Sequence, residues 1–259
     1  MKSKIKKEHL KFIWIFVLLA VWELTARFGP VNPISFPSLA VIASALWESV
    51  ITGDIISQIW FSMGFILTGL LTAIILSLVL ASISTFSELM DSFTDTLVSV
   101  FHPLPGIAML PLIILWFGTG SKAIFIIIIH SVIWPMLLNL KSGFKSVPEI
   151  YRKIGQNYEH SMAGILFKIF IPASLPFGLA GIKIGWARAW RAVISAEMVF
   201  GATGGKGGIG WYIFNKRVFM DTPGLFAGLI VIIGIGILVE DLVIGKIENS
   251  TVKKWGTSQ

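Results

Sequence analysis

The chain has 259 residues, of which 55% are hydrophobic and only 14% charged, and its mean hydropathy is +0.82. A soluble globular domain carries about 25% charged residues, so this composition excludes a water-soluble particle and indicates an integral membrane protein in contact with lipid. The net charge is +7, but the basic residues gather beside hydrophobic segments, as in membrane proteins, and no nucleic-acid partner is expected. The chain has no cysteine, which excludes disulfides and thiol chemistry.

Two transmembrane helices with a shorter helix between them are predicted at the start of the chain. The first span, about 11–28, follows a lysine-rich start and lacks a small-x-small cleavage site, so we expect it to be retained. Pro37 precedes a segment, 38–51, that has the pattern of an amphipathic helix. The second span, about 57–83, contains glycines and serines of the kind that let membrane helices pack closely.

A third span, about 94–117, is interrupted by Pro103, Pro105 and Pro111. Each proline removes a backbone donor, so the helix must be kinked or broken. Broken backbone at membrane depth is tolerated only against protein or a water-filled cavity. This segment is therefore a candidate part of a transport pathway.

Three further hydrophobic spans complete the prediction, and a polar segment separates the first two of them. The spans are about 122–140, 176–199 and 224–245, and the polar segment is 141–175. The chain, 1–259, is thus expected to be a single all-α transmembrane domain of about six helices.

Six spans place both termini on the same side of the membrane. Both ends are rich in lysine, which indicates the cytoplasm, and the same count makes 141–175 cytoplasmic, in agreement with its basic residues. The loop 84–93 would also be cytoplasmic, although it carries Glu88 and Asp91 and no basic residue. Acidic residues contribute little to topology, so the count stands.

The fifth span carries charged residues inside hydrophobic sequence. A cation at the centre of a membrane helix costs about 3 kcal/mol on insertion scales, so it usually faces a cavity or a partner. Arg188, Arg191 and Ser195 are spaced to share one helix face, and an arginine fork suits a planar oxyanion. The alternative for the arginines is a structural ion pair with Glu197, or snorkelling of their side chains toward the membrane interface. The alternative for His130 and Asn139 of the fourth span is a buried hydrogen bond to a neighbouring helix. The candidate pathway residues are Arg188, Arg191, Ser195, Glu197, His130 and Asn139.

The sequence does not predict a nucleotide-binding site. Residues 205–210 match Gly-x-Gly-x-x-Gly, but they follow a membrane helix instead of a strand, so we interpret them as a flexible extracytoplasmic turn. No Walker A sequence is present, so this chain is not expected to hydrolyse ATP by that route. No catalytic, metal or cofactor constellation stands out either.

The polar segment resembles the cytoplasmic "EAA" loop of ATP-binding-cassette (ABC) importer permeases. Lys153-Ile154-Gly155 takes the Glu-Ala-Ala place, and Ile171-Pro172 takes the closing Leu-Pro place. Lys153 replaces the acidic residue of the pattern. Glu159 replaces a glycine that permits a tight turn, so we expect this turn to be built differently.

Other stretches are similar to permeases of the nitrate/sulfonate/taurine type. They include His102-Pro103-Leu104-Pro105, Pro111-Leu112-Ile113-Ile114-Leu115-Trp116-Phe117-Gly118, Phe36-Pro37-Ser38, Arg188-Ala189-Trp190 and Ala196-Glu197-Met198. His102 stands where the family usually has arginine. These matches follow one another in the expected order over nearly the whole chain.

The resemblance implies a type I ABC importer permease fold and a function in the cytoplasmic (inner) membrane. It implies a homodimer that moves a small anion by alternating access, with a separate ATPase subunit that binds ATP and Mg²⁺ and an extracytoplasmic solute-binding protein. The loop would couple to the ATPase through Tyr151, Ile154, Gly155, Tyr158 and Glu159.

Two other classes of protein stay open at the level of sequence. An ion- or proton-coupled secondary transporter would use Arg188, Arg191 and Glu197 as a relay, and uptake through it would collapse with an uncoupler. A membrane-embedded enzyme or assembly factor would use the polar loop as a docking platform, but the sequence offers no nucleophile–base arrangement to support it.

Overall fold

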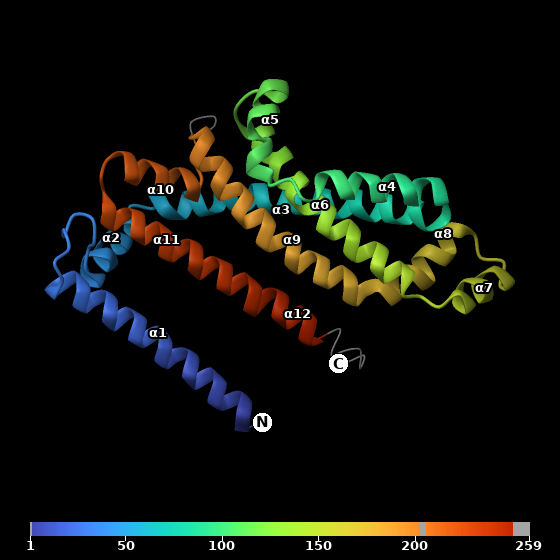
Figure 1. Ribbon diagram of the computed structural model, residues 1–259, viewed down its shortest axis with the longest axis horizontal. Coiled ribbons are helices and arrows are strands. Elements are labelled where there is room, and N and C mark those ends of the chain that lie inside the picture. Colours follow the sequence, from blue (N-terminus) through green and yellow to red (C-terminus); the bar gives the residue numbers. More distant parts are fainter. Residues whose placement is uncertain (1, 203–205, 251–259) are drawn as a thin grey trace.

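The computed structural model describes residues 2–202 and 206–250, and every element in this part of the chain is a helix (Figure 1). Three long helices form the centre: α3 (Asp54–Phe86), α6 (Ser121–Lys145) and α9 (Ile171–Phe200). The helix α6 packs between the other two and supplies fully buried side chains such as Ile124, Ile128 and Leu137. The expected all-α fold is confirmed for the described residues.

Glycines allow α9 to approach α6 closely. A β-carbon built on Gly181 would lie 2.7 Å from Met136 Sδ, and one built on Gly185 would lie 3.0 Å from Val132 Cγ1. The two glycines are four residues apart and so face the same helix, the small-xxx-small pattern of membrane helix pairs. A larger residue at either position would push α9 away from the centre.

Within the described residues, four helices are long and apolar enough to cross a membrane. They span Asp54–Phe86, Ser121–Lys145, Met162–Phe200 and Thr222–Glu248. A fifth candidate is a broken pair, in which α4 (Glu88–Phe101) meets η1 (Gly106–Met109) and α5 (Leu110–Phe117) at an angle of 89°. This break lies at Pro103 and Pro105, where the sequence predicts it.

The predicted first span, 11–28, falls within α1 (Lys2–Phe28), and its crossing of the membrane stays a prediction. The short helix expected at 38–51 is α2 (Leu39–Ile51). In Figure 1, α1 runs toward the end of the molecule that holds α2 and α10. The last segment, α11 (Thr222–Ile237), π-helical η3 (Leu238–Ile244) and α12 (Gly245–Ser250), runs back the opposite way.

The polar segment predicted at 141–175 is shorter than expected, because helices extend into it from both sides. The helix α6 continues to Lys145, and the helix that contains α9 begins already at α8 (Met162–Ile165) and passes through π-helical η2 (Leu166–Phe170). Pro172, which closes the loop pattern in the sequence, lies in the first turn of α9, directly after η2. The connecting segment is reduced to 146–161, around α7 (Glu149–Asn157).

The interpretation of 205–210 as a flexible turn is wrong for the described residues at its end. Gly208 precedes α10 (Ile209–Val218), and Ile209 is fully buried. The sequence analysis missed this helix because it is short and carries Lys216 and Arg217. The glycines serve close packing here, since a β-carbon on Gly207 would meet the Trp211 ring.

Candidate permease pathway and docking helix

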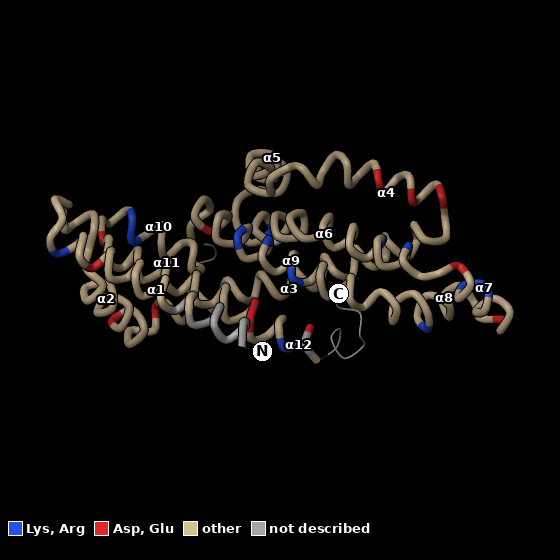
Figure 2. Tube along the Cα trace, turned by 60° about the horizontal axis from the view of Figure 1, so that its bottom comes forward, with Lys and Arg blue, Asp and Glu red and all other residues tan. Residues whose placement is uncertain are grey.

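A hollow of about 430 Å³ lies where the break between α4 and η1 meets α6 and α9. The break contributes the segment 102–107 to the wall of the hollow. The helix α6 contributes residues between His130 and Trp134, and α9 contributes residues between Arg188 and Ser195. Figure 2 shows charged positions concentrated at the two ends of the molecule, with a small basic group near the middle of α9. The lining residues are His102, Pro103, Leu104, Pro105, Gly106, Ile107, His130, Ser131, Trp134, Arg188, Arg191, Ala192 and Ser195.

Several polar groups of this hollow lack hydrogen-bond partners among the described residues. None of its described lining residues is acidic, and in the part of the chain that the structure describes Arg188 has no ion-pair or hydrogen-bond partner. Arg191 donates its Nε–H to the carbonyl of Ala187 (2.9 Å). Both ring nitrogens of His130 and the indole nitrogen of Trp134 are buried without a hydrogen-bond partner. Buried donors without acceptors are rare in proteins, so the hollow is suited to an anion or to water.

Glu197 lies outside the hollow. It is fully buried and accepts hydrogen bonds from Ser62 Oγ–H (2.7 Å) and from the backbone N–H of Gly210 (2.9 Å). Ser62 in turn accepts the N–H of Ile209 (2.9 Å). This carboxylate therefore joins α9, α3 and the start of α10, and the alternative of an ion pair with the arginines is not formed.

Asn139 also lies outside the hollow, and its amide donates to the carbonyl of Pro135 (2.8 Å) one turn earlier in α6. The structure thus brings together four of the six predicted pathway residues: Arg188, Arg191, Ser195 and His130. The sequence analysis did not select Trp134, although its spacing of four from His130 places it on the same face of α6.

The helix α7 presents an exposed apolar face on the end of the molecule opposite α10. Ile150, Tyr151, Ile154 and Tyr158 are 57%, 52%, 41% and 75% exposed. Gly155 is buried against α8 and η2, where a β-carbon would lie 3.0 Å from Ile165 Cγ1 and 2.8 Å from Ile169 Cδ1. Of the predicted coupling residues, Gly155 thus anchors α7, while Tyr151, Ile154 and Tyr158 face outward.

The turn after α7 is built as in a glycine-containing loop, contrary to the expectation. Glu159 has φ = +53°, the left-handed conformation that glycine adopts freely. The N–H of His160 bonds to the carbonyl of Gly155 (3.1 Å), and that of Glu159 to the carbonyl of Gln156 (2.9 Å). This is a Schellman motif, and its stability is enough to hold Glu159 in the conformation that favours glycine.

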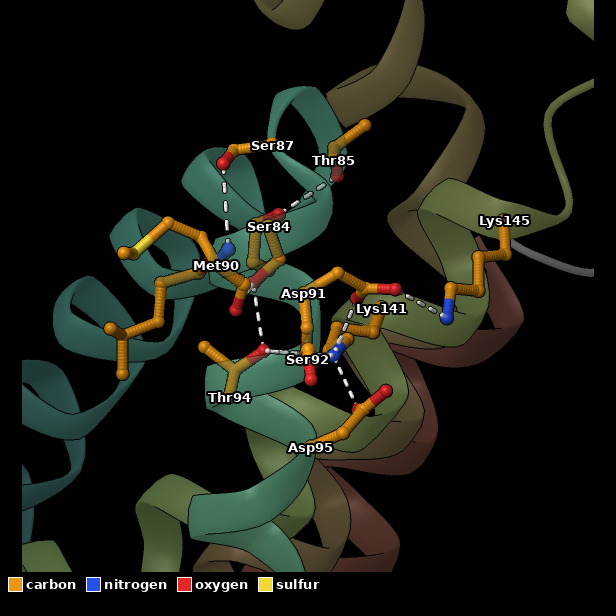
Figure 3. Close-up of polar contacts among 12 residues, drawn as sticks. Ser84, Thr85, Ser87, Met90, Asp91, Ser92, Thr94, Asp95, Lys141 and Lys145 are labelled. Carbon is orange, nitrogen blue, oxygen red and sulfur yellow. Dashed lines mark hydrogen bonds and ion pairs between the residues drawn. The ribbon is translucent and has the colours of Figure 1, made fainter.

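A second hollow, of about 920 Å³, lies between α4, the end of α6 and α7. Beside it, Lys141 of α6 pairs with Asp91 (2.7 Å) and Asp95 (2.5 Å) of α4, and Lys145 pairs with Asp91 (3.2 Å) (Figure 3). Asp91, one of the two acidic residues of the loop 84–93, is thus paired with two lysines at the end of α6.

The family described as "Binding-protein-dependent transport system inner membrane component" matches residues 73–251. The match spans α6, α7 and α9, which carry both features described above. The chain belongs to this family. It is the permease subunit of an ABC importer and an inner-membrane component.

Relatives of this permease carry names of the nitrate/sulfonate/taurine type. The putative aliphatic sulfonates transport permease protein SsuC of Bacillus subtilis is 25% identical over 93% of this chain and 86% of its own length. The taurine transport system permease protein TauC of Escherichia coli is 25% identical over 92% and 91%. The nitrate import permease protein NrtB of Leptolyngbya laminosa is 27% identical over 89% and 83%. The resemblance expected from the sequence is confirmed.

Proposed function

We propose that this permease conducts a small anion through the hollow lined by Arg188 and Arg191. The observation that carries the proposal is a basic hollow with unpaired buried donors and no carboxylate among its described lining residues. The named relatives transport aliphatic sulfonates, taurine and nitrate, which share a compact oxyanion group. Guanidinium groups bind such groups through paired hydrogen bonds.

The exposed face of α7 docks on a separate ATPase subunit. Ile154 and Tyr158 are apolar and exposed on a segment that follows α6 on the cytoplasmic side, where lipid does not cover them. ATP and Mg²⁺ bind to that ATPase, and this chain holds no cofactor of its own. ATP binding shifts the transporter between its two orientations because the ATPase has a different affinity for each of them.

Both termini face the cytoplasm, and two copies of the permease enclose the pathway. In Figure 1 the start of α1 and α12 both lie on the side away from α10, as this orientation requires. Leu104, Ile107 and Trp116, in and after the break, are exposed apolar residues that a second copy would cover beside the hollow. A solute-binding protein delivers the anion from the opposite side.

Uptake into proteoliposomes tests the anion pathway. The complex that co-purifies with the tagged chain is reconstituted with its binding protein, and ATP-driven uptake of labelled nitrate, taurine and methanesulfonate is measured. Arg188→Met is expected to lower uptake of the transported anion by about tenfold or more, because a charged hydrogen bond is lost.

Lys183→Met is the matched control. Lys183 is a second cation of α9, but it lies outside the hollow and pairs with Glu240 (3.7 Å) at an exposed position. Its loss is expected to change uptake by less than about twofold. Equal effects of the two variants would remove the hollow from the pathway. Uptake that needs no ATP and collapses with an uncoupler would instead favour the secondary transporter.

A further inference from the structure

Lys141 is a buried cation whose bonds all run from α6 to α4. Its residue is 5% exposed, and Figure 3 shows its ammonium directed between Asp91 and Asp95. Beside the two carboxylates it donates to Thr94 Oγ1 (2.8 Å), and the carbonyl of Asp91 lies 3.2 Å away. All three N–H groups of the ammonium therefore have acceptors on a single turn of α4.

The cluster of Asp91, Asp95, Lys141 and Lys145 has no net charge, since it holds two aspartates and two lysines. A buried lysine is strongly unfavourable unless its charge is paired and its protons are bonded. Rupture of these bonds would leave the ammonium of Lys141, a residue only 5% exposed, without its carboxylate partners. Lys141 and its turn of α4 are thus expected to move together.

The charged cluster holds one end of α4 to α6, and apolar contacts hold the other end. Of the described residues of α4 only Thr94 and Val98 are buried, and Thr94 belongs to the cluster through Lys141 and through Ser84 of α3 (2.9 Å). Farther along, Val98 packs in a cluster with Leu137 and Leu140, and the Phe101 ring stacks on Trp134. The attachment of α4 near the end of α6 that leads to α7 therefore depends on the charged cluster.

The cluster lies between the two functional features of the chain. Lys145 is the last residue of α6, and only 146–148 separate it from α7, the docking helix. At its other end α4 leads directly into 102–107, which form one wall of the basic hollow. A displacement of α7 would first move the end of α6, to which it is joined. The ion pairs of the cluster would then move α4 together with α6.

We propose that Lys141 is a positioning residue that transmits movement of the docking helix to the pathway wall. This rests on the proposed function, since it takes α7 as the ATPase contact and the hollow as the pathway. Asp91 and Asp95 receive the movement on α4. Lys145, which is 64% exposed at its side chain and bonds to Asp91 alone, adds little.

The test compares ATP hydrolysis and anion uptake in the purified, reconstituted complex. Lys141→Met keeps the length and removes the charge, and it is expected to lower uptake by about tenfold while ATP hydrolysis stays within about twofold, in the usual range of coupling energies. Lys141→Arg restores most of the uptake because it keeps the charge and the donors. Lys145→Met is the matched control and leaves both rates within about twofold.

A distance measurement separates transmission from a merely structural role. Because this chain has no cysteine of its own, spin labels can be attached to it at two chosen sites, by Ser99→Cys on α4 and Lys122→Cys at the far end of α6. Their separation is expected to change on ATP binding in the parent complex and to stay fixed in Lys141→Met. A normal distance change in Lys141→Met, or a parallel loss of hydrolysis and uptake, would overturn the proposal.

If Lys141→Met does not fold, Asp95→Asn tests whether the cluster transmits movement from α6 to α4. Asp95 has a side chain 55% exposed, so its loss leaves Lys141 paired with Asp91. Reduced uptake per ATP hydrolysed supports transmission through the cluster, and an unchanged ratio contradicts it. A parent complex that shows no ATP-driven uptake would instead refute the proposed function itself.

Discussion

Glu159 is a charged residue in a backbone conformation that strains any residue with a β-carbon. Its φ of +53° lies in the left-handed region, which costs a non-glycine residue about 1 kcal/mol. Glu159→Gly should therefore stabilise the end of α7 by about 1 kcal/mol. Hydrogen exchange at the amides of Glu159 and His160 should slow by about fivefold, since exchange reports local opening.

Glu159→Ala is the control, because alanine keeps the β-carbon and removes only the carboxylate. It should leave exchange at these amides close to that of the parent chain. Faster exchange in Glu159→Gly than in the parent would show that the carboxylate, and not the left-handed conformation, determines the stability of the turn.

Glu197 holds three helices through a buried carboxylate. Glu197→Leu leaves the Ser62 hydroxyl and the Gly210 N–H without an acceptor and should lower the free energy of unfolding by about 2 to 4 kcal/mol. Glu197→Gln keeps one carbonyl oxygen and should lose clearly less. Thermal unfolding of the detergent-purified chain measures both, and equal melting temperatures for the parent and Glu197→Leu would contradict the anchoring role.

Sequence spacing predicted which residues of α9 line the basic hollow, but it did not predict that Glu197 lies outside the hollow. Arg188, Arg191 and Ser195 share a helix face, so their common environment followed from helical geometry. Glu197 is two residues after Ser195 and points to another side, toward Ser62 far away in the sequence. A partner at such a separation is set by tertiary packing, which the local pattern does not contain.

The packing of α7 depends on a residue without a side chain. Gly155→Leu would place carbon atoms against Ile165 and Ile169, and such overpacking costs about 1 to 3 kcal/mol. The displaced α7 should retain less ATPase when the tagged permease is purified from native membranes. Gly164→Ala is the matched control, since its β-carbon would meet its nearest neighbour at 3.4 Å. Equal recovery of ATPase with both variants would show that α7 tolerates displacement.

The turn between α10 and α11 should be sensitive to acid. Burial raises the pKa of Asp221, but hydrogen bonds from Lys216 (2.7 Å) and from the N–H of Gly224 (3.0 Å) outweigh it and hold the pKa below its usual range. A lowered folded-state pKa gives stability that is complete above the unfolded value of about 4 and is lost as the pH falls through the folded value.

Asp221→Asn should therefore melt at a lower temperature than the parent near pH 7, and the difference should shrink below about pH 4. Thermal unfolding of the purified chain at several pH values measures this difference. A constant difference over the whole range would show that the charge of Asp221 does not stabilise the turn.

Element boundaries followed the hydrophobic pattern where a helix is apolar along its length. The spans at 57–83 and 122–140 correspond to α3 and α6; α3 is three residues longer at each end, and α6 is one residue longer at its start and five at its end. The pattern failed at 162–175, because Pro172 and Pro176 mark a helix end in most sequences but lie within a helix here. A π-helical turn before them is a feature of backbone packing that composition does not reveal.

The whole molecule is an apolar helical scaffold that carries a basic hollow near its middle and the exposed apolar face of α7 at one end. Hydropathy alone predicted the membrane class, and the break at Pro103 and Pro105 predicted where the scaffold opens. The ion pairs that link α4 to α6 were hidden, since Asp91 and Lys141 are fifty residues apart in sequence and meet only in the fold.

The proposed contact between α7 and a separate ATPase subunit determines how this permease would be driven. The most direct test is purification of the tagged chain from mild detergent extracts of its native membranes, with partners identified by mass spectrometry. The parent and Gln156→Glu, which adds charge on another face of α7, should recover an ATPase with a Walker A sequence, and Ile154→Glu combined with Tyr158→Glu should lose it. Recovery that is the same in all three, or no ATPase in any of them, would contradict the account.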